Sequence, residues 1–265
     1  MAIDIASLRS SRDGQRPPRV LIYGPPGLGK TSLAAEFPNP VFIDVEQGIP
    51  GDLEVPTFGE VAGYDAVIES IGALYSGDHA FQTVVIDSLD KLEPMVWAKT
   101  CADNKWASIE DPGYGKGYVA ADRYWQQLLD GLNALRRDRG MAIVLIAHSH
   151  VERFESPVSA PYNRYDIRLH KRASALVQDD VDAILFVNHD PSLKTDDVGF
   201  NKKVTHAAGG STRWIFCEGR PAYTAKNRYG LPERVLFNKG QGYAELAKHF
   251  PNAAPAAQQP AQAAA

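Results

Sequence analysis

Short apolar runs alternate with segments of helical periodicity along most of this chain. An uninterrupted apolar run of about four to eight residues predicts a buried strand, and apolar positions three or four residues apart predict a helix with one buried face. The apolar runs predict strands at 20–23, 41–45, 83–86, 142–147 and 183–187. The helical spacing predicts helices that open at 32–36 and that cover 64–75, 88–101, 122–138, 171–179 and about 242–249.

This alternation predicts an α/β fold with a mostly parallel sheet and helices on both faces. Shorter apolar segments late in the chain predict antiparallel strands at the C-terminal edge of the sheet, at 203–206, 212–217, 222–226 and 234–237. Ligands of such folds bind at the carboxyl ends of the parallel strands. Asp44, Asp87 and His148 each lie at or next to the carboxyl end of a predicted strand, so they are the first candidates for a site.

The composition is that of an ordinary cytoplasmic protein. The chain has 28 Lys and Arg against 32 Asp and Glu, a net charge of −4, which argues against a generally basic nucleic-acid coat. Cys101 and Cys217 lie far apart without metal-binding spacing, which favours a reducing compartment. No apolar stretch reaches the roughly 18 residues that would span a bilayer, so we expect no membrane partner.

A complete phosphate-binding pattern, G-x-x-x-x-G-K-[ST], lies between the first predicted strand and the first predicted helix. Glycines let the backbone wrap closely round phosphates and turn its N–H groups inward. Lys30 is expected to reach the β- and γ-phosphates and Thr31 to ligate Mg²⁺, so the sequence predicts ATP and Mg²⁺ as cofactors. The predicted nucleotide-binding residues are Gly24, Pro25, Pro26, Gly27, Leu28, Gly29, Lys30, Thr31 and Ser32.

Asp87 ends the third predicted strand, which is where a Walker B aspartate orients the Mg²⁺ shell. We therefore predict Asp87 and Thr31 as the metal ligands. Many ATPases with this kind of loop, such as the AAA+ group, place a glutamate directly after that aspartate as general base, but here Ser88 follows. Glu46, just past the second predicted strand, is then the candidate base, with His148 as the next candidate.

Several segments resemble the RecA recombinase family. Residues 42–46 match a Phe-Ile-Asp-x-Glu setting that places the catalytic glutamate after the second strand, and 84–88 resemble the Walker B strand. Residues 145–149 resemble the strand whose polar end senses the γ-phosphate, although His-Ser replaces Asn-Gln. Residues 225–228 resemble a Lys-Asn-Lys segment that RecA inserts into the neighbouring subunit's ATP site, with Arg in place of the second Lys.

The resemblance implies a RecA-like P-loop ATPase core that forms a homo-oligomer. It assigns catalytic roles to Glu46, which would polarise water, to Lys30, and to His148, which would sense the γ-phosphate. Lys226 and Arg228 would complete a neighbour's site in trans; the alternative is that they form a solvated strand end. We accordingly predict an N-terminal extension at 1–18, the ATPase domain at 19–250 and a disordered Ala/Pro/Gln tail at 251–265.

The chain looks closest to the short phage-encoded RecA-like ATPases, the Sak group of single-strand annealing proteins. Their Gly-Tyr-Gly-Lys-Gly-Tyr and Lys-Asn-Arg-Tyr-Gly-Leu-Pro segments are present here at 113–118 and 226–232. This resemblance implies single-stranded DNA as partner, annealing in phage recombination as function, and the cytoplasm of a bacterial host as location. It leaves open whether a single-stranded DNA-binding protein is a further partner.

Two segments lie where RecA carries its DNA loops. Aromatic rings interleaved with cations suit single-stranded DNA, because the rings stack on bases and the cations neutralise phosphates. The plainer interpretation is a surface loop or a lid over the nucleotide. The candidate DNA contacts are Lys105, Tyr114, Lys116 and Tyr118 in 104–118, and Arg153, Tyr162, Arg164, Tyr165, Arg168 and Lys171 in 151–172.

Two other functions remain open at this stage. A helicase-like or loader motor would use the same ATPase core to drive movement. A nucleotide-gated DNA-binding module would bind ATP and DNA with negligible turnover.

Overall fold

The sheet at the centre of the molecule has five parallel strands. The computed structural model describes residues 16–156, 160–190, 193–197, 203–207 and 212–253. Within them the parallel strands lie in the order β6-β1-β4-β3-β2. Each contains one of the predicted apolar runs, except that β2 ends one residue before the end of the predicted run 41–45. Their bounds are Arg19–Gly24 (β1), Pro40–Asp44 (β2), Thr83–Asp87 (β3), Ala142–Phe154 (β4) and Ala183–His189 (β6).

Antiparallel strands continue the sheet beyond β6, as predicted. Strand β9 (Arg213–Phe216) pairs with β6, and β11 (Arg234–Leu236) pairs with β9. Two expectations at this edge need correction. Residues 203–206 belong to β8 (Lys203–Ala207), which pairs with β7 (Leu193–Asp197) in a separate two-stranded sheet. Of 222–226 only the last residue is strand, in the two-residue β10 (Lys226–Asn227) beside the start of β6.

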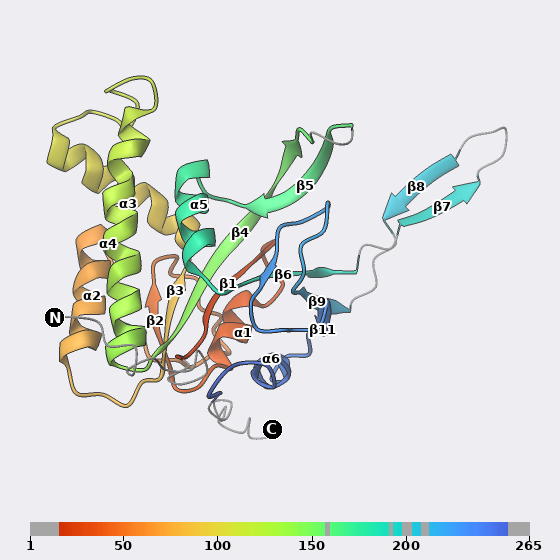
Figure 1. Ribbon diagram of the computed structural model, residues 1–265, viewed down its shortest axis with the longest axis horizontal. Coiled ribbons are helices and arrows are strands. Elements are labelled where there is room, and N and C mark those ends of the chain that lie inside the picture. Colours follow the sequence, from red (N-terminus) through yellow and green to blue (C-terminus); the bar gives the residue numbers. More distant parts are fainter. Residues whose placement is uncertain (1–15, 157–159, 191–192, 198–202, 208–211, 254–265) are drawn as a thin grey trace, which may run out of the picture.

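Helices cover both faces of the sheet because successive residues of each strand point to opposite sides. In β1, Leu21 and Tyr23 belong to one core cluster, while Val20 and Ile22 belong to the other. The first cluster includes residues of α2 (Tyr64–Ser76), α3 (Leu89–Asn104), α4 (Lys116–Asp138) and α5 (Lys171–Asp180). The second includes α1 (Lys30–Ala35) and α6 (Gly242–Ala247), and Figure 1 shows these two groups on opposite sides. The predicted fold class is confirmed.

The fourth strand is longer than its apolar run predicts. Residues 142–147 of β4 are buried, but the strand continues to Phe154 with alternating exposure, because this half leaves the sheet. It pairs antiparallel with β5 (Tyr162–Ile167), which places Glu152 opposite Arg164. Part of the predicted surface segment 151–172 is therefore a β-hairpin, which projects beyond the sheet in Figure 1. We call β4 from Ser149 onward, together with β5, the hairpin.

The predicted domain boundaries stay predictions. Most of the expected N-terminal extension (1–15) and of the expected tail (254–265) lies outside the described residues. Among the helices that the structure describes, none combines the length and the apolar character that a membrane crossing needs.

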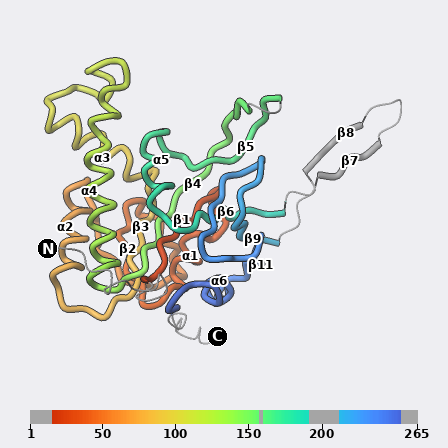
Figure 2. The backbone as a smooth tube through the Cα atoms, in the orientation of Figure 1, coloured from red at the N-terminus to blue at the C-terminus, as the bar shows by residue number. Residues whose placement is uncertain are grey.

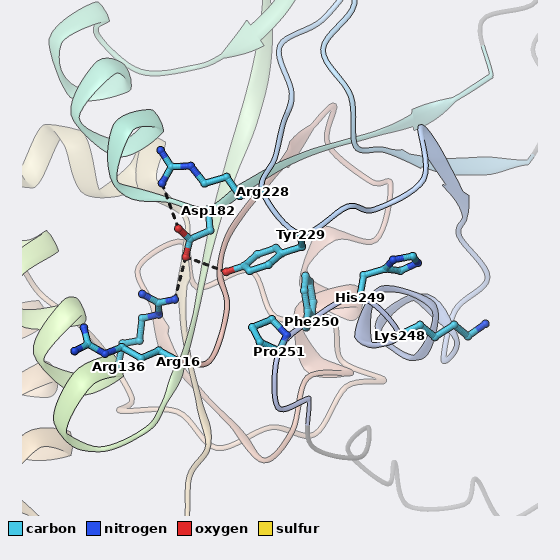
Figure 3. A pocket seen from close by; sticks show the side chains of 9 residues that line it. All are labelled: Arg16, Arg136, Asp182, Arg228, Tyr229, Lys248, His249, Phe250 and Pro251. Carbon is cyan, nitrogen blue, oxygen red and sulfur yellow. Dashed lines mark hydrogen bonds and ion pairs between the residues drawn. The ribbon is translucent and has the colours of Figure 1, made fainter. Parts of the chain in front are cut away.

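A buried carboxylate ties the amino ends of the strands to the helical layer. Asp182 lies directly before β6. Its carboxylate is 2.9 Å from the guanidinium of Arg19 in β1 and 3.1 Å from that of Arg136 in α4, and it accepts a hydrogen bond from the Tyr229 hydroxyl at 2.9 Å. Figure 3 shows it at the side of a cleft of about 710 Å³, with Arg228 3.4 Å away. Burial disfavours the charged form, but hydrogen bonds from Arg19 and Tyr229, together with the charges of Arg19 and Arg136, outweigh burial and hold the pKa of Asp182 below its usual value.

Replacement of Asp182 by Ala is expected to lower the free energy of unfolding by about 3–5 kcal/mol, because it removes the carboxylate partner of Arg136 and one of the two carboxylates that pair with Arg19. The loss should shrink as the pH falls below about 4, since a carboxylate with a lowered folded pKa stabilises only while it is ionised. Denaturant unfolding measures the change. Arg228→Ala is the control: its side chain is 56% exposed, and we expect a loss below about 1 kcal/mol. Equal losses in the two variants would contradict this account.

Candidate nucleotide-binding site

The phosphate loop joins the end of β1 to the start of α1 at the carboxyl edge of the sheet. Two of its glycines are required by geometry. A Cβ on Gly24 would lie 2.2 Å from the carbonyl oxygen of Val187, and Gly29 has a left-handed φ of 87° directly before the helix. Such close approach and positive φ suit glycine alone without strain. The fold therefore places the predicted loop where parallel strands present their carboxyl ends.

Lys30 is buried within this loop. Its Nζ donates hydrogen bonds to the carbonyl oxygens of Gly24 at 3.1 Å and Pro25 at 2.9 Å. Burial lowers the pKa of Lys30, while Asp87, Asp90 and Glu46 nearby oppose that shift. The loop thus holds a cation at its inner side, where phosphates would bind.

The two predicted metal ligands lie together. The Thr31 hydroxyl donates to Oδ2 of Asp87 at 2.7 Å. Burial raises the pKa of Asp87 to about 6 although this hydrogen bond lowers it, so a cation beside the carboxylate would favour its charged form. Hydroxyl and carboxylate oxygens are ligands that Mg²⁺ accepts, and Mg²⁺ commonly takes its remaining ligands from phosphates and water. Among the described residues, no group of three or more His, Cys, Asp or Glu side chains could hold a metal ion by itself.

Glu46 lies beside these groups and is oriented by its neighbour in space. The hydroxyl of Ser88, which is fully buried, donates to Oε2 of Glu46 at 2.8 Å. The residue that replaces the usual glutamate after Asp87 therefore positions the glutamate that follows β2. Nδ1 of His148 lies 3.9 Å from the same Oε2. The structure brings Glu46, Asp87 and His148 together as predicted, in a cleft of about 430 Å³ that Lys30 and Thr31 also line.

Asp90 is a site residue that the sequence did not reveal. Its carboxylate accepts the backbone N–H of His148 at 2.8 Å and the ring Nδ1–H at 3.0 Å, and it also accepts from Arg168. Burial opposes ionisation of Asp90, but these donors outweigh it and hold its pKa well below the usual range. Its position three residues after Asp87 is the only local signal that could have suggested it.

The C-terminal edge of the sheet adds two cations to the cleft, Arg213 and Lys239, which were also missed. Nη1 of Arg213 donates to the carbonyl oxygen of Leu28 at 3.2 Å, and Lys239 pairs with Asp52 at 2.7 Å. Arg213 lies in β9, beyond β6, so only the tertiary fold brings it to the loop. No local motif marks either residue.

Lys226 and Arg228 lie at the other end of the sheet from their own phosphate loop. Lys226 is paired with Ile184 near the start of β6, whereas the loop follows the last residue of the parallel strand β1. Lys226 Nζ donates to the carbonyl oxygen of Gln178 at 2.6 Å, and Arg228 contacts the Asp182 carboxylate. The structure therefore does not bring them into the cleft of the same chain. Figure 3 shows Arg228 at the separate cleft described above.

The first candidate DNA segment is partly helical. Lys105 directly follows the last residue of α3 and has a left-handed conformation with φ 58°, and Tyr114 is fully exposed. Lys116 and Tyr118, however, lie in the first turn of α4, which starts before the predicted residue 122. The Tyr118 ring stacks on the His170 ring with a centroid distance of 3.9 Å, so this face of the ring is covered by His170 and not open to a DNA base. Lys105, Tyr114 and Lys116 are the members that face solvent.

Two of the four candidate cations of the second segment have acidic partners within the segment. Arg153 pairs with Glu155 at 2.9 Å, and Arg164 pairs with Asp166 at 2.5 Å and Glu152 at 3.3 Å. These pairs balance the charges of Arg153 and Arg164 within the segment.

The remaining members of the second segment have different surroundings. Tyr165 packs against the core residue Phe186 with 5.2 Å between the ring centroids, and Tyr162 packs against Phe154 with 5.4 Å between the ring centroids. Lys171 is an exposed first residue of α5, and Arg168 contacts Asp90. The segment is therefore a paired hairpin and not a continuous basic loop.

Comparison with known proteins agrees with the geometry of the cleft. The model of a family described as AAA domain matches residues 16–229. The chain belongs to this AAA domain family. The match spans the strands and the loop that form the cleft, so the chain is a P-loop NTPase.

Other comparisons add little. No curated protein matches the chain. Among solved structures, the chain is similar to one titled "Crystal structure of the RadB recombinase", with 16% identity, a TM-score of 0.46, and coverage of 84% of this chain and 87% of that one. We draw nothing further from a likeness this distant.

Glu46→Gln is expected to keep ATP affinity and to slow hydrolysis by about 10²–10⁴-fold, the usual contribution of a general base. Ser88→Ala, which removes the hydrogen bond to Glu46, should slow it less. Glu54→Gln is the control because Glu54 is exposed and outside the cleft. Single-turnover phosphate release at saturating ATP measures the step. Wild-type rates in Glu46→Gln would assign the base to another group, with His148 next.

Proposed function

We propose that the chain is a RecA-like, Mg²⁺-dependent ATPase that binds single-stranded DNA and promotes annealing in phage recombination, as in the Sak group. The observation that carries the ATPase assignment is the convergence of Lys30, Thr31, Asp87 and Glu46 on one cleft. The phage setting and the annealing activity rest on the sequence resemblance at 113–118 and 226–232.

Each of these side chains has a distinct role in the proposed reaction. The loop and Lys30 bind the phosphates, and Thr31 and Asp87 hold the metal. Bound Mg²⁺ would neutralise charge on the β- and γ-phosphates. Glu46, held by Ser88, orients the attacking water and takes its proton, and His148 lies close enough to Glu46 to contact the same region. Catalysis would come from positioning and electrostatic stabilisation.

We place the DNA contacts at the exposed members of the two candidate segments. Figure 2 shows the α3–α4 connection and the hairpin at the same end of the molecule, with α5 between them. Lys105, Tyr114 and Lys116 lie at the first, and Arg153 and Tyr162 lie near the tip of the second, where β4 ends and β5 begins. A single strand of DNA that contacts both segments would run across this end of the molecule.

Combined replacement of Lys105, Tyr114 and Lys116 by Ala is expected to weaken single-stranded DNA binding by at least tenfold, because one stacked base alone contributes about 1–3 kcal/mol. The slope of log affinity against log salt should fall by about 1 to 2. Fluorescence anisotropy of a labelled oligonucleotide measures both. Lys91→Ala, an exposed lysine of α3 outside the segment, is the control. Unchanged affinity and slope in the triple variant would remove the α3–α4 connection from the DNA surface.

We further propose that the protein assembles as a homo-oligomer in which Lys226 and Arg228 complete a neighbour's site. Their location at the opposite end of the sheet from their own loop is compatible only with a trans role or with none. Cations supplied in trans stabilise charge that develops in phosphoryl transfer.

Mixing two inactive variants tests the trans role. Lys226→Ala/Arg228→Ala and Glu46→Gln should each lose DNA-stimulated hydrolysis alone. In mixed oligomers some sites combine an intact Glu46 with an intact neighbour, so part of the activity should return. Hydrolysis is measured across mixing ratios, and co-assembly is confirmed by light scattering. Absence of recovery in confirmed co-assemblies would leave the two residues as a strand end tied to Gln178 and Asp182.

A further inference from the structure

The first two turns of α3 carry two buried carboxylates. The helix begins two residues after Asp87, and Asp90 and Glu93 lie on one face of it because they are three residues apart. The Asp90 side chain is 3% exposed, and residue Glu93 is 7% exposed. Buried carboxylates need hydrogen-bond donors, and both find them outside their own helix.

Asp90 contacts both ends of the hairpin. Its oxygens accept from the N–H and ring of His148, the last residue of β4 before the hairpin, and from the guanidinium of Arg168, the first residue after β5. The N–H of Arg168 also donates to the carbonyl oxygen of His148 at 2.9 Å. The base of the hairpin is thereby closed on itself and attached to α3.

Glu93 continues the attachment one turn further along. Its carboxylate accepts the N–H of His170, directly before α5, at 2.9 and 3.1 Å. The His170 ring stacks on Tyr118, in the first turn of α4. The same two carboxylates therefore contact the hairpin base and, through His170, the first turn of α4, where the α3–α4 connection ends.

The other end of this set of contacts is the nucleotide cleft. His148 lies 3.9 Å from the Glu46 carboxylate and lines the cleft. An ionised carboxylate can only accept hydrogen bonds, so Nδ1 of His148 must carry the proton that it donates to Asp90. If nucleotide binding moves the His148 side chain, its hydrogen bond to Asp90 changes, and so does the contact between Asp90 and Arg168.

We propose that Asp90 and Glu93 are positioning residues that couple the occupancy of the nucleotide cleft to the hairpin and the α3–α4 connection. This inference rests on the proposed function, since it concerns how ATP and single-stranded DNA affect each other. Such coupling is reciprocal: DNA tightens nucleotide binding by the same factor by which nucleotide tightens DNA binding. Packing alone predicts a loss of stability without a change in that factor.

Arg168 allows a test that does not depend on a buried substitution. Its side chain is 51% exposed, so Arg168→Ala and Arg168→Lys should fold, as denaturant unfolding can verify. Asp90→Asn changes the other side of the same contact. It replaces one carboxylate oxygen, which accepts hydrogen bonds from His148 and Arg168, by an amide N–H₂ group that cannot accept them. Arg172→Ala removes a neighbouring exposed ion pair, with Asp122, that lies outside the proposed coupling contacts and serves as the control.

The measurement is the affinity for a non-hydrolysable ATP analogue with Mg²⁺, with and without a saturating single-stranded oligonucleotide. We expect the oligonucleotide to tighten analogue binding by about 5- to 150-fold in the wild type. The factor should fall close to one in Arg168→Ala and Asp90→Asn, recover in part in Arg168→Lys, and remain at the wild-type value in Arg172→Ala.

The outcomes separate the two levels of the proposal. Absence of analogue or DNA binding in the wild type would overturn the proposed function, and binding of both without coupling would overturn the present inference. Wild-type coupling that persists in folded Arg168→Ala would also overturn the inference and leave the proposed function standing. Weaker DNA affinity with an unchanged factor would do the same, because it would make Arg168 a simple DNA contact.

Discussion

The site depends on one buried cation, Lys30, among carboxylates at the carboxyl edge of the sheet. Asp87, Asp90 and Glu46 all lie close enough to influence its pKa. Each of these carboxylates also accepts a hydrogen bond: Asp87 from Thr31, Glu46 from Ser88 and Asp90 from His148. Arg168 pairs with Asp90, which leaves Lys30 beside the carboxylates of Asp87 and Glu46. Burial chiefly, and the nearby charge of Glu46 in addition, raise the pKa of Asp87. A divalent cation bound beside Asp87 would restore the balance, as Mg²⁺ binding with a nucleotide requires.

The parallel register of the sheet explains why these groups meet. Strands β1, β2, β3 and β4 run in the same direction, and Asp44 is in register with Asp87 as Gly24 is with His148. The residues that follow the strands therefore converge, although they are far apart in sequence. At the opposite edge of the sheet, the Asp182 contacts hold the amino ends of β1 and β6 to α4.

Sequence patterns predicted the parts of this arrangement that are encoded locally. The five parallel strands, the loop, Asp87 and Glu46 were found because apolar runs and short motifs mark them. Asp90 and Arg213 were missed because their roles depend on neighbours from other elements, Arg168 in one case and Leu28 in the other. The sequence predicts a loop at 151–172 and not a hairpin, because no local apolar run reveals the strand pairing of this segment. Lys116 and Tyr118 were placed in a loop because glycines before them obscured the start of α4.

Equilibrium binding of Mg²⁺-ATP to the wild type and to Lys30→Ala tests the central claim most directly. Isothermal titration with and without Mg²⁺, alongside denaturant unfolding, separates loss of the site from loss of the fold. The account predicts that the wild type binds ATP more tightly with Mg²⁺ than without it. It also predicts that folded Lys30→Ala loses this binding, because the loop then lacks the cation that opposes the phosphates. Wild-type affinity in a folded Lys30→Ala chain would contradict the assignment of the cleft.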